Sequence, residues 1–148
     1  MANASNKKDF QFAIANVSTE QFSVTPEEFR PKENVDVTIH FSFKLAAKEQ
    51  MVGVFMHLSF HQQHCKLINL EVGCHFKVHP DTWPLLLDDK REKLKLRLHL
   101  ALHLATITTG TARGVLHARL TGSPFAHLVL PAVDLTTMLK SDIELSLS

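Results

Sequence analysis

The sequence predicts an α+β fold in which a four-stranded antiparallel sheet is followed by a long helix and a short C-terminal helix, both packed on one face of the sheet. Two observations support this prediction. Apolar residues alternate with polar ones through most of residues 10–78, and they recur at helical spacing in the last third of the chain. The chain has 148 residues, which is enough for one domain with its own core. Its composition, with 45% apolar and 21% charged residues, is typical of a globular protein. We therefore expect one domain over residues 10–140, with tails over residues 1–9 and 141–148.

The strands are recognised by their apolar residues, which fall on either the odd or the even positions of each strand; we call this the parity of the strand. The first is expected to begin near Phe10 and to end at Pro26, because proline cannot continue a ladder of backbone hydrogen bonds. In residues 35–45 the odd positions are apolar, whereas in residues 52–60 and 68–78 the even positions are. Four consecutive strands, each with one buried face, are then predicted to pair as an antiparallel meander.

Parity also predicts the register of the strands. Antiparallel partners must share a face, and a slip of one residue would turn the whole apolar set towards solvent. The expected cross-strand pairs are Leu45 with Val52, His40 with His57, and Leu58 with Ile68. The last pair leaves residues 62–64 as the turn between the last two strands.

The helices are predicted from spacing and from stop signals. An apolar stripe over residues 112–120 indicates a long helix, which should end near Gly122 and Pro124. Asp134 can cap a second, short helix. In residues 94–104 leucine alternates with Lys, Arg, His and Ala at the period of a strand, yet these residue types favour helices and β-branched residues are absent. Period and propensity therefore disagree on this segment.

The C-terminal third contains three short motifs in a fixed order. They are Ala112-Arg113-Gly114-Val115-Leu116, Thr121-Gly122-Ser123-Pro124-Phe125 and Pro131-Ala132-Val133-Asp134-Leu135. This order resembles the end of the SecB export chaperone family, and the match needs no gap from Ala112 to Leu139. Family members have a long helix with an Ala-Arg pair, a break at Gly and Pro/Phe, an extended linker, and a last helix that starts at Asn or Asp. The resemblance implies a SecB-like domain, with residues 94–104 as the first part of the long helix.

The resemblance also implies a function. SecB-like proteins hold unfolded polypeptides by their apolar segments, without ATP, until the clients reach the membrane translocase or a folding partner. Their grooves require exposed apolar side chains, since burial of client surface is worth about 25 cal/mol per Å². The residues that we expect to bind clients are Phe55, Trp83, Leu86 and Phe125.

Subunit contacts are implied in the same way. Family members pair the first strand edge to edge across a dimer, and dimers often join into tetramers through the long helices. A homo-oligomer of this kind is expected here. The corresponding interface residues are Phe10, Phe12, Ile14, Leu102, Ala105, Ala112 and Leu116.

The sequence departs from the family at the expected contact with the motor SecA. That contact uses acidic residues on the outer sheet face, where this chain offers Glu71, with Glu20 nearby, while Ser23 and Asn69 replace an acidic and an apolar residue. Classical members are strongly acidic, whereas this chain has a formal charge of +1. Long-range attraction to a basic partner would be weak. A SecA-independent chaperone of one dedicated client, such as an antitoxin, is therefore an alternative to an export chaperone.

The sequence contains no catalytic arrangement, such as a glycine-rich phosphate loop, a nucleophile elbow or an acid–base pair of carboxylates. We therefore expect neither an enzyme nor a cofactor. The near-neutral charge argues against nucleic-acid binding. A polar N-terminal stretch, without a long apolar run anywhere, predicts a cytoplasmic protein that does not insert into membranes.

Histidines suggest an alternative of another class, a metal or small-ligand binding protein on the same fold. Among 10 histidines, His99 and His103 form an i, i+4 pair on one helix face. His61, His64 and Cys65 form a second group. Neither group supplies four ligands, so no metal site is predicted, and His99 with His103 remain its candidates.

Overall fold

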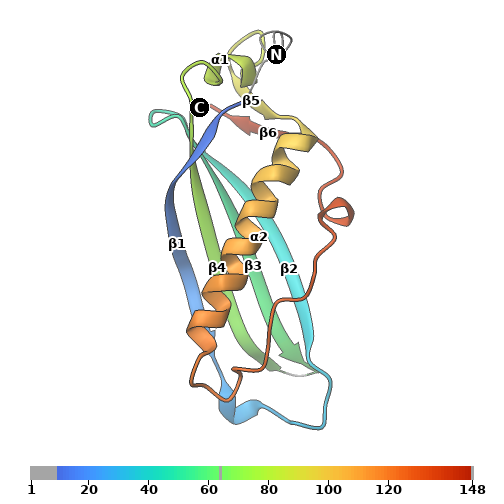
Figure 1. Cartoon of the computed structure of the whole chain (residues 1–148). Helices are drawn as coiled ribbons and strands as arrows, with labels where there is room; N and C mark the ends of the chain where they lie inside the picture. The colour runs from blue at the N-terminus through green and yellow to red at the C-terminus, as the bar shows by residue number, and fades with distance from the viewer. Residues whose placement is uncertain (1–9, 64, 148) are drawn as a thin grey trace, which may run out of the picture.

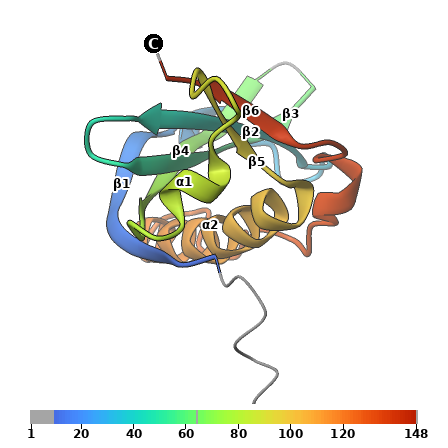
Figure 2. The same ribbon diagram turned by 90° about the horizontal axis from the view of Figure 1, so that it is seen from above.

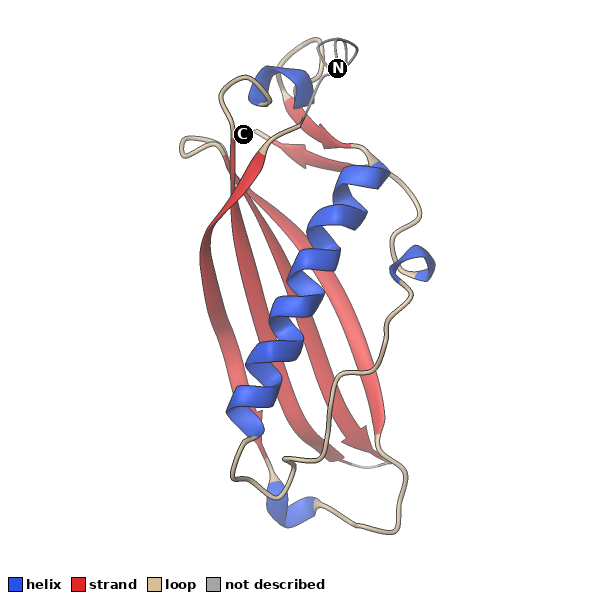
Figure 3. Cartoon of the chain, viewed as in Figure 1, coloured by secondary structure: helices blue, strands red, loops and turns tan. Residues whose placement is uncertain are grey.

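The computed structural model describes residues 10–63 and 65–147, so the expected tail over residues 1–9 lies outside the described part. The elements are β1 (Phe12–Val24), η2 (Pro26–Glu28), β2 (Asp36–Ala46), β3 (Met51–Gln62), β4 (Cys65–Val78), α1 (Trp83–Leu86), β5 (Lys93–Leu96), α2 (Leu98–Leu120), η3 (Leu135–Thr137) and β6 (Ile143–Ser146). The first four strands form one antiparallel sheet, and α2 crosses one face of it diagonally (Figure 1). We call this face the inner face and the opposite one the outer face. Figure 3, coloured by secondary structure, shows the sheet and helix α2 as two layers. This arrangement confirms the predicted α+β class.

The order of the strands corrects the predicted meander. β2, β3 and β4 pair in sequence order, but β1 pairs with β4, so the sheet order is β1-β4-β3-β2. Residues 25–35, which include η2, carry the chain from one edge of the sheet to the other (Figure 1). A connection of this length leaves either edge available, whereas a tight turn forces neighbouring strands to pair. Pairing with β4 places Phe22 beside Leu70 and Val24 beside Ile68, which extends the apolar inner face.

The predicted register is confirmed for the β2–β3 hairpin and wrong for the β3–β4 hairpin. Leu45 lies opposite Val52 and His40 opposite His57, as expected. Leu58, however, lies opposite Leu70 rather than Ile68. The turn is tighter than predicted, because Gln62 already pairs with Cys65, and a β-bulge beside Phe60 absorbs the difference. The error is two residues, so the apolar side chains still face inward.

Helix α2 covers the centre of the inner face. One side of it packs against β3 and β4, and its exposed side carries small and polar residues. Within residues 10–63 and 65–147, no helix is long and apolar enough to cross a membrane. The buried positions of α2 recur at spacings of three and four, as in an amphipathic helix. They are Leu100, Ala101, Leu104, Ala105, Thr108, Thr109, Ala112, Leu116 and Leu120.

The start of the long helix corrects the prediction for residues 94–104. Residues 93–96 form β5, and α2 begins at Leu98. Leu94 and Leu96 are fully buried, while the lysines that alternate with them are exposed. The strand is stabilised by pairing with β6, since Leu94 lies opposite Leu145 and Leu96 opposite Ile143. Burial and a non-local partner therefore override helix propensity here, whereas residues 98–104 are helical as predicted.

The C-terminal region corrects two further expectations. The short helix expected after Asp134 is reduced to the single turn η3, although the Asp134 side chain does accept a hydrogen bond from the Thr136 N–H (3.1 Å). The Thr137 hydroxyl bonds back to the Asp134 carbonyl (2.8 Å), and such local bonds compete with helix formation. The expected tail over residues 141–148 contains β6, whose Ile143 and Leu145 pack on the core.

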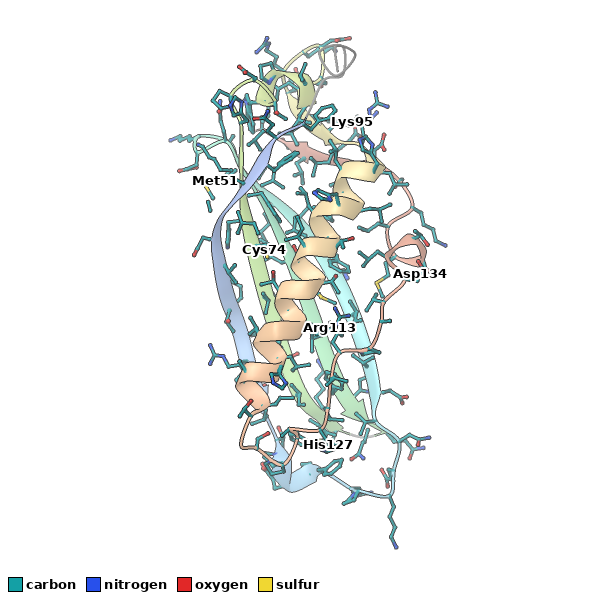
Figure 4. All side chains as sticks on the ribbon, in the orientation of Figure 1. Met51, Cys74, Lys95, Arg113, His127 and Asp134 are labelled. Atoms are coloured by element: carbon teal, nitrogen blue, oxygen red, sulfur yellow. The ribbon has the colours of Figure 1, made fainter. Side chains whose placement is uncertain are left out.

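The linker between α2 and η3 runs back along the helix towards the small β5–β6 sheet (Figure 1). Arg113 of α2, labelled in Figure 4, binds the linker through two hydrogen bonds. Its Nε donates to the Leu130 carbonyl (3.2 Å) and its Nη2 to the Pro131 carbonyl (3.1 Å). Phe125 and Leu130 anchor the linker in the core. The linker therefore closes the β2 side of the inner face.

Asp142 should stabilise the start of α2 from a distance in sequence. Its Oδ1 accepts a hydrogen bond from the Leu98 N–H (2.7 Å), and its Oδ2 lies 3.7 Å from Lys95 Nζ. We expect Asp142→Ala to lower the free energy of unfolding by about 1 kcal/mol, the usual value of a helix cap, and Asp142→Asn to lower it less, because an acceptor oxygen remains. Urea unfolding measures both, with Lys140→Ala as the control. Equal losses in the two Asp142 variants would contradict the role of the hydrogen bond.

Candidate functional site

The side chains predicted to bind clients are mostly buried in this structure. Phe125 is fully buried against Phe29, with the ring centroids 5.3 Å apart, and Leu86 and Phe55 are buried as well. Phe55 and Phe125 therefore offer no surface to a client, and the prediction is corrected for these two residues, whereas Leu86 contributes to the lining of a hollow. Trp83 is partly buried and keeps some accessible surface.

Phe55 is buried for an unexpected reason. It lies on the outer face, yet its ring covers Gly53 and Gly73, and a Cβ built on Gly73 would lie 2.6 Å from Phe55 Cε1. The His75 ring meets it edge to face at 5.4 Å, and Lys44 Nζ lies 4.7 Å from its centroid. Two glycines thus make room for a flat aromatic side chain on the sheet. Phe55 is therefore part of the packing of the outer face.

The segment between β4 and α2 lies at one end of the molecule, where α1 and the β5–β6 sheet are beside the start of β1 (Figures 1 and 2). Side chains of these elements line a hollow. We call it the apical hollow. Its volume is about 520 Å³, within the range of small-ligand pockets. We call its four apolar lining residues the floor and its six charged lining residues the rim. The lining residues are Phe10, Leu85, Leu86, Leu87, Asp88, Asp89, Lys93, Lys95, Arg97 and Glu144.

Backbone and side-chain contacts hold the apical hollow in place. The Thr82 hydroxyl accepts a hydrogen bond from the Gln11 N–H (2.9 Å), which ties the start of β1 to α1. Leu86 is buried in the core, and Leu87 forms an isolated bridge with Leu94 of β5. Leu85, between these anchors, stays 41% exposed. The short turn of α1 therefore presents one large apolar side chain of the floor to solvent.

The rim of the apical hollow balances its charges. Asp88, Asp89 and Glu144 face a similar number of basic residues among the lining side chains. The backbone N–H of Lys93 holds the pKa of Asp88 below its usual value, with smaller help from the Glu92 N–H. Because the pKa is lowered, this carboxylate supports the turn at neutral pH and loses that effect as the pH falls through the lowered pKa. Because acidic and basic residues are equally numerous on the rim, it gives little selectivity for the sign of a ligand's charge.

The predicted oligomer residues fall into two groups. Ile14 of β1 is exposed on the inner face beside the edge of the sheet at which no other described strand pairs, which we call the free edge. Phe10, Phe12 and Leu102 are partly buried. By contrast, three helix residues are already buried in the core of this chain, which corrects their assignment to a subunit interface. They are Ala105, Ala112 and Leu116.

The predicted contacts with SecA do not form an acidic surface. Glu20 is exposed in β1 at a β-bulge, and Glu71 is partly buried between its cross-strand neighbours Gln21 and His57. Lys77, on the same strand as Glu71, faces outward as well and donates to the Glu49 carbonyl. The outer face therefore mixes both charges.

The histidine pair on α2 lies at the surface. His99 and His103 are both exposed, and the His99 ring lies 6.3 Å from that of Phe10. Within residues 10–63 and 65–147, no group of three or more His, Cys, Asp or Glu side chains could hold a metal ion. His64, part of the second predicted group, lies outside the described residues.

Comparison with known proteins supports the fold of this chain alone. No protein-family model matches the chain, and no curated protein sequence matches it. Among solved structures, the Mycobacterium tuberculosis Rv1957 SecB-like chaperone, in complex with a ChAD peptide from the Rv1956 HigA1 antitoxin, superposes with a TM-score of 0.53. The superposition covers 83% of this chain and 88% of that chain, at 13% sequence identity. The fold of this chain is therefore SecB-like, as the resemblance of its C-terminal motifs implies.

Proposed function

We propose that this protein is a chaperone that binds apolar segments of unfolded polypeptides in the apical hollow. The observation that supports it best is the apolar floor with its exposed Leu85. A similarly folded protein binds an antitoxin peptide, which favours a polypeptide as the ligand. The proposed mechanism is burial of client surface, so it needs no catalytic step and no ATP.

Between the two kinds of chaperone, the outer face favours the dedicated one. Its mixed charges would steer a basic partner such as SecA only weakly. The balanced rim of the apical hollow likewise sets no charge preference, so specificity would come from the apolar residues of the client. We propose that the protein works in the cytoplasm on one or a few clients, such as an antitoxin, rather than as a general export chaperone.

Subunit association is proposed along the free edge of β1. An unpaired strand edge can add a strand from a second copy, and Ile14 and Val17 lie exposed beside it on the inner face. On α2, a Cβ added at Gly110 or Gly114 would meet no atom within 4 Å, so these glycines leave room for a second helix. The mass of the protein by size-exclusion light scattering distinguishes a monomer from a dimer or tetramer.

The function is tested with a chemically unfolded client diluted into buffer with and without the protein. Light scattering should show suppressed aggregation without nucleotide, and the complex should have a defined mass. Leu85→Asp should weaken client binding about tenfold, the effect expected when a charge replaces one apolar anchor. Val129→Asp is the matched control, because Val129 is 61% exposed but lies in the linker outside the apical hollow.

Two results would count against the proposal. One is a well-folded protein that suppresses aggregation of neither a general client nor a toxin–antitoxin client. The other is an equal loss of binding in Leu85→Asp and Val129→Asp, because a general effect of added charge would then explain both variants.

A further inference from the structure

The outer face contains a second hollow, which the proposed function does not use. It has a volume of about 380 Å³ and lies over β2, β3 and β4 near the β3–β4 turn, on the side of the sheet away from α2. We call it the outer hollow. The strand register places its side chains together, since His40 lies opposite His57, Thr38 opposite Ser59, and His61 opposite Lys66. A polar cluster is thus assembled on a rigid sheet.

Ser59 is the central observation. Its side chain lines the outer hollow but is only 5% exposed, and its hydroxyl has no hydrogen-bond partner among the described residues. Buried polar atoms are almost always satisfied by protein or by water, so an unsatisfied hydroxyl in a hollow points to a ligand. The hydroxyl can rotate and either donate or accept.

The hydrogen bonds around Ser59 indicate which neighbouring atoms are available. Asn69 Nδ2 donates to Gln21 Oε1 (2.7 Å), so Asn69 Oδ1 is the atom that faces His57 Nε2, at 2.5 Å. An amide oxygen only accepts, hence His57 Nε2 carries the proton. His61 Nε2 lies 2.8 Å from Thr38 Oγ1. Among the described residues, the Nδ1 atoms of His57 and His61 make no hydrogen bond.

The charges of the outer hollow suit an anion. Among its described lining residues, Lys66 carries the only permanent charge and there is no carboxylate. Protonated imidazoles would add positive charge and donate from both nitrogens. Carboxylates do lie beside the hollow, among them Asp36 opposite His61, Glu71 opposite His57, and Glu33, whose backbone carbonyl accepts a hydrogen bond from Gln62 Nε2 (3.2 Å).

We propose that the outer hollow binds a small oxyanion, a phosphate or carboxylate, through the Ser59 hydroxyl, Lys66 and the imidazoles of His57 and His61. A metal ion fits less well, because the described residues supply no group of three ligands and Lys66 would repel a cation. The hollow faces away from the inner face and does not share residues with the apical hollow. The proposal therefore stands independently of the chaperone function.

Binding is tested on the full chain without client. Inorganic phosphate and, separately, acetate are titrated at constant ionic strength and followed by NMR of the backbone amides and histidine side chains. Phosphate should give saturable shifts at His57, Ser59, His61 and Lys66 and raise the thermal midpoint.

Two variants test the assignment of residues. Ser59→Ala and Lys66→Gln should each weaken phosphate binding about three- to tenfold and reduce the thermal shift that it causes. Ser59→Ala removes a hydroxyl without a described partner, so it should leave the midpoint in phosphate-free buffer unlowered. Lys90→Gln is the control, since Lys90 is exposed outside the hollow. Shifts that rise linearly with both anions, or binding unchanged in both variants, would overturn the proposal.

Discussion

Phe125→Ala should lower the free energy of unfolding by about 3–5 kcal/mol, the usual cost of removing a fully buried phenylalanine. The Phe125 ring fills the core between the linker and the sheet and meets Phe29 edge to face at 5.3 Å. Its loss leaves a cavity and removes one of the two anchors that hold the linker in the core. Urea unfolding measures the change, and Val129→Ala, four residues further along the linker, should stay within about 0.5 kcal/mol of the original protein.

This result separates two roles for Phe125. If the residue stabilises the fold, the variant should lose client binding only under conditions in which it also unfolds. A variant that stays fully folded, with a loss below about 1 kcal/mol, yet no longer binds client would show instead that Phe125 leaves the core to contact clients.

Gly73→Ala should destabilise the protein by roughly 1–3 kcal/mol, because the added Cβ would lie 2.6 Å from Phe55 Cε1 and 2.9 Å from Ser18 Oγ. Phe55 lies directly opposite Gly73, so its ring must move. The same substitution at Gly114 of α2, where a Cβ meets no atom within 4 Å, should stabilise the helix by up to about 1 kcal/mol.

A double-mutant cycle identifies the cause. In a Phe55→Ala background, Gly73→Ala should cost much less, which corresponds to a coupling energy of about 1–3 kcal/mol measured by urea unfolding. Additive effects of the two substitutions would show that Ser18 or the backbone, rather than the Phe55 ring, opposes the new methyl group.

The sequence predicts well those features that depend on local patterns. Parity identifies the inner faces of the strands, and the short turn after β2 makes the Leu45–Val52 pair predictable. The body of α2 follows from its apolar stripe, and its end from Gly122, whose φ of 81° is one that glycine adopts without strain. In each case the deciding contacts are near in sequence.

Features that depend on distant partners are not predicted. Parity gives β1 a buried face but not the edge of the sheet at which it pairs. Likewise, Leu94 and Leu96 show the period of a strand, but the partner that decides the matter is β6, and the alternation of Ile143 and Leu145 is too short to identify β6 by itself.

The candidate sites show the same limit. The predicted β3–β4 register is two residues out and places Phe55 opposite Glu71, whereas the structure places it opposite Gly73, which is what buries it. The sequence singles out Leu86 after Trp83, but only the turn of α1 decides that Leu86 is buried and Leu85 is exposed. Side-chain exposure therefore has to be taken from the structure.

During synthesis, a ribosome would make the two strands of the small sheet at different times. β5 emerges before α2, whereas β6 emerges only after α2, the linker and η3. Until then, Leu94 and Leu96 lack their strand partners, the Leu98 N–H lacks the Asp142 carboxylate, and Glu144 does not yet close the rim. Closing so long a loop also costs entropy. The growing chain can therefore build its large sheet before β5 acquires its strand partner, so the wall of the apical hollow that β5 and β6 form is completed in one of the last steps of folding.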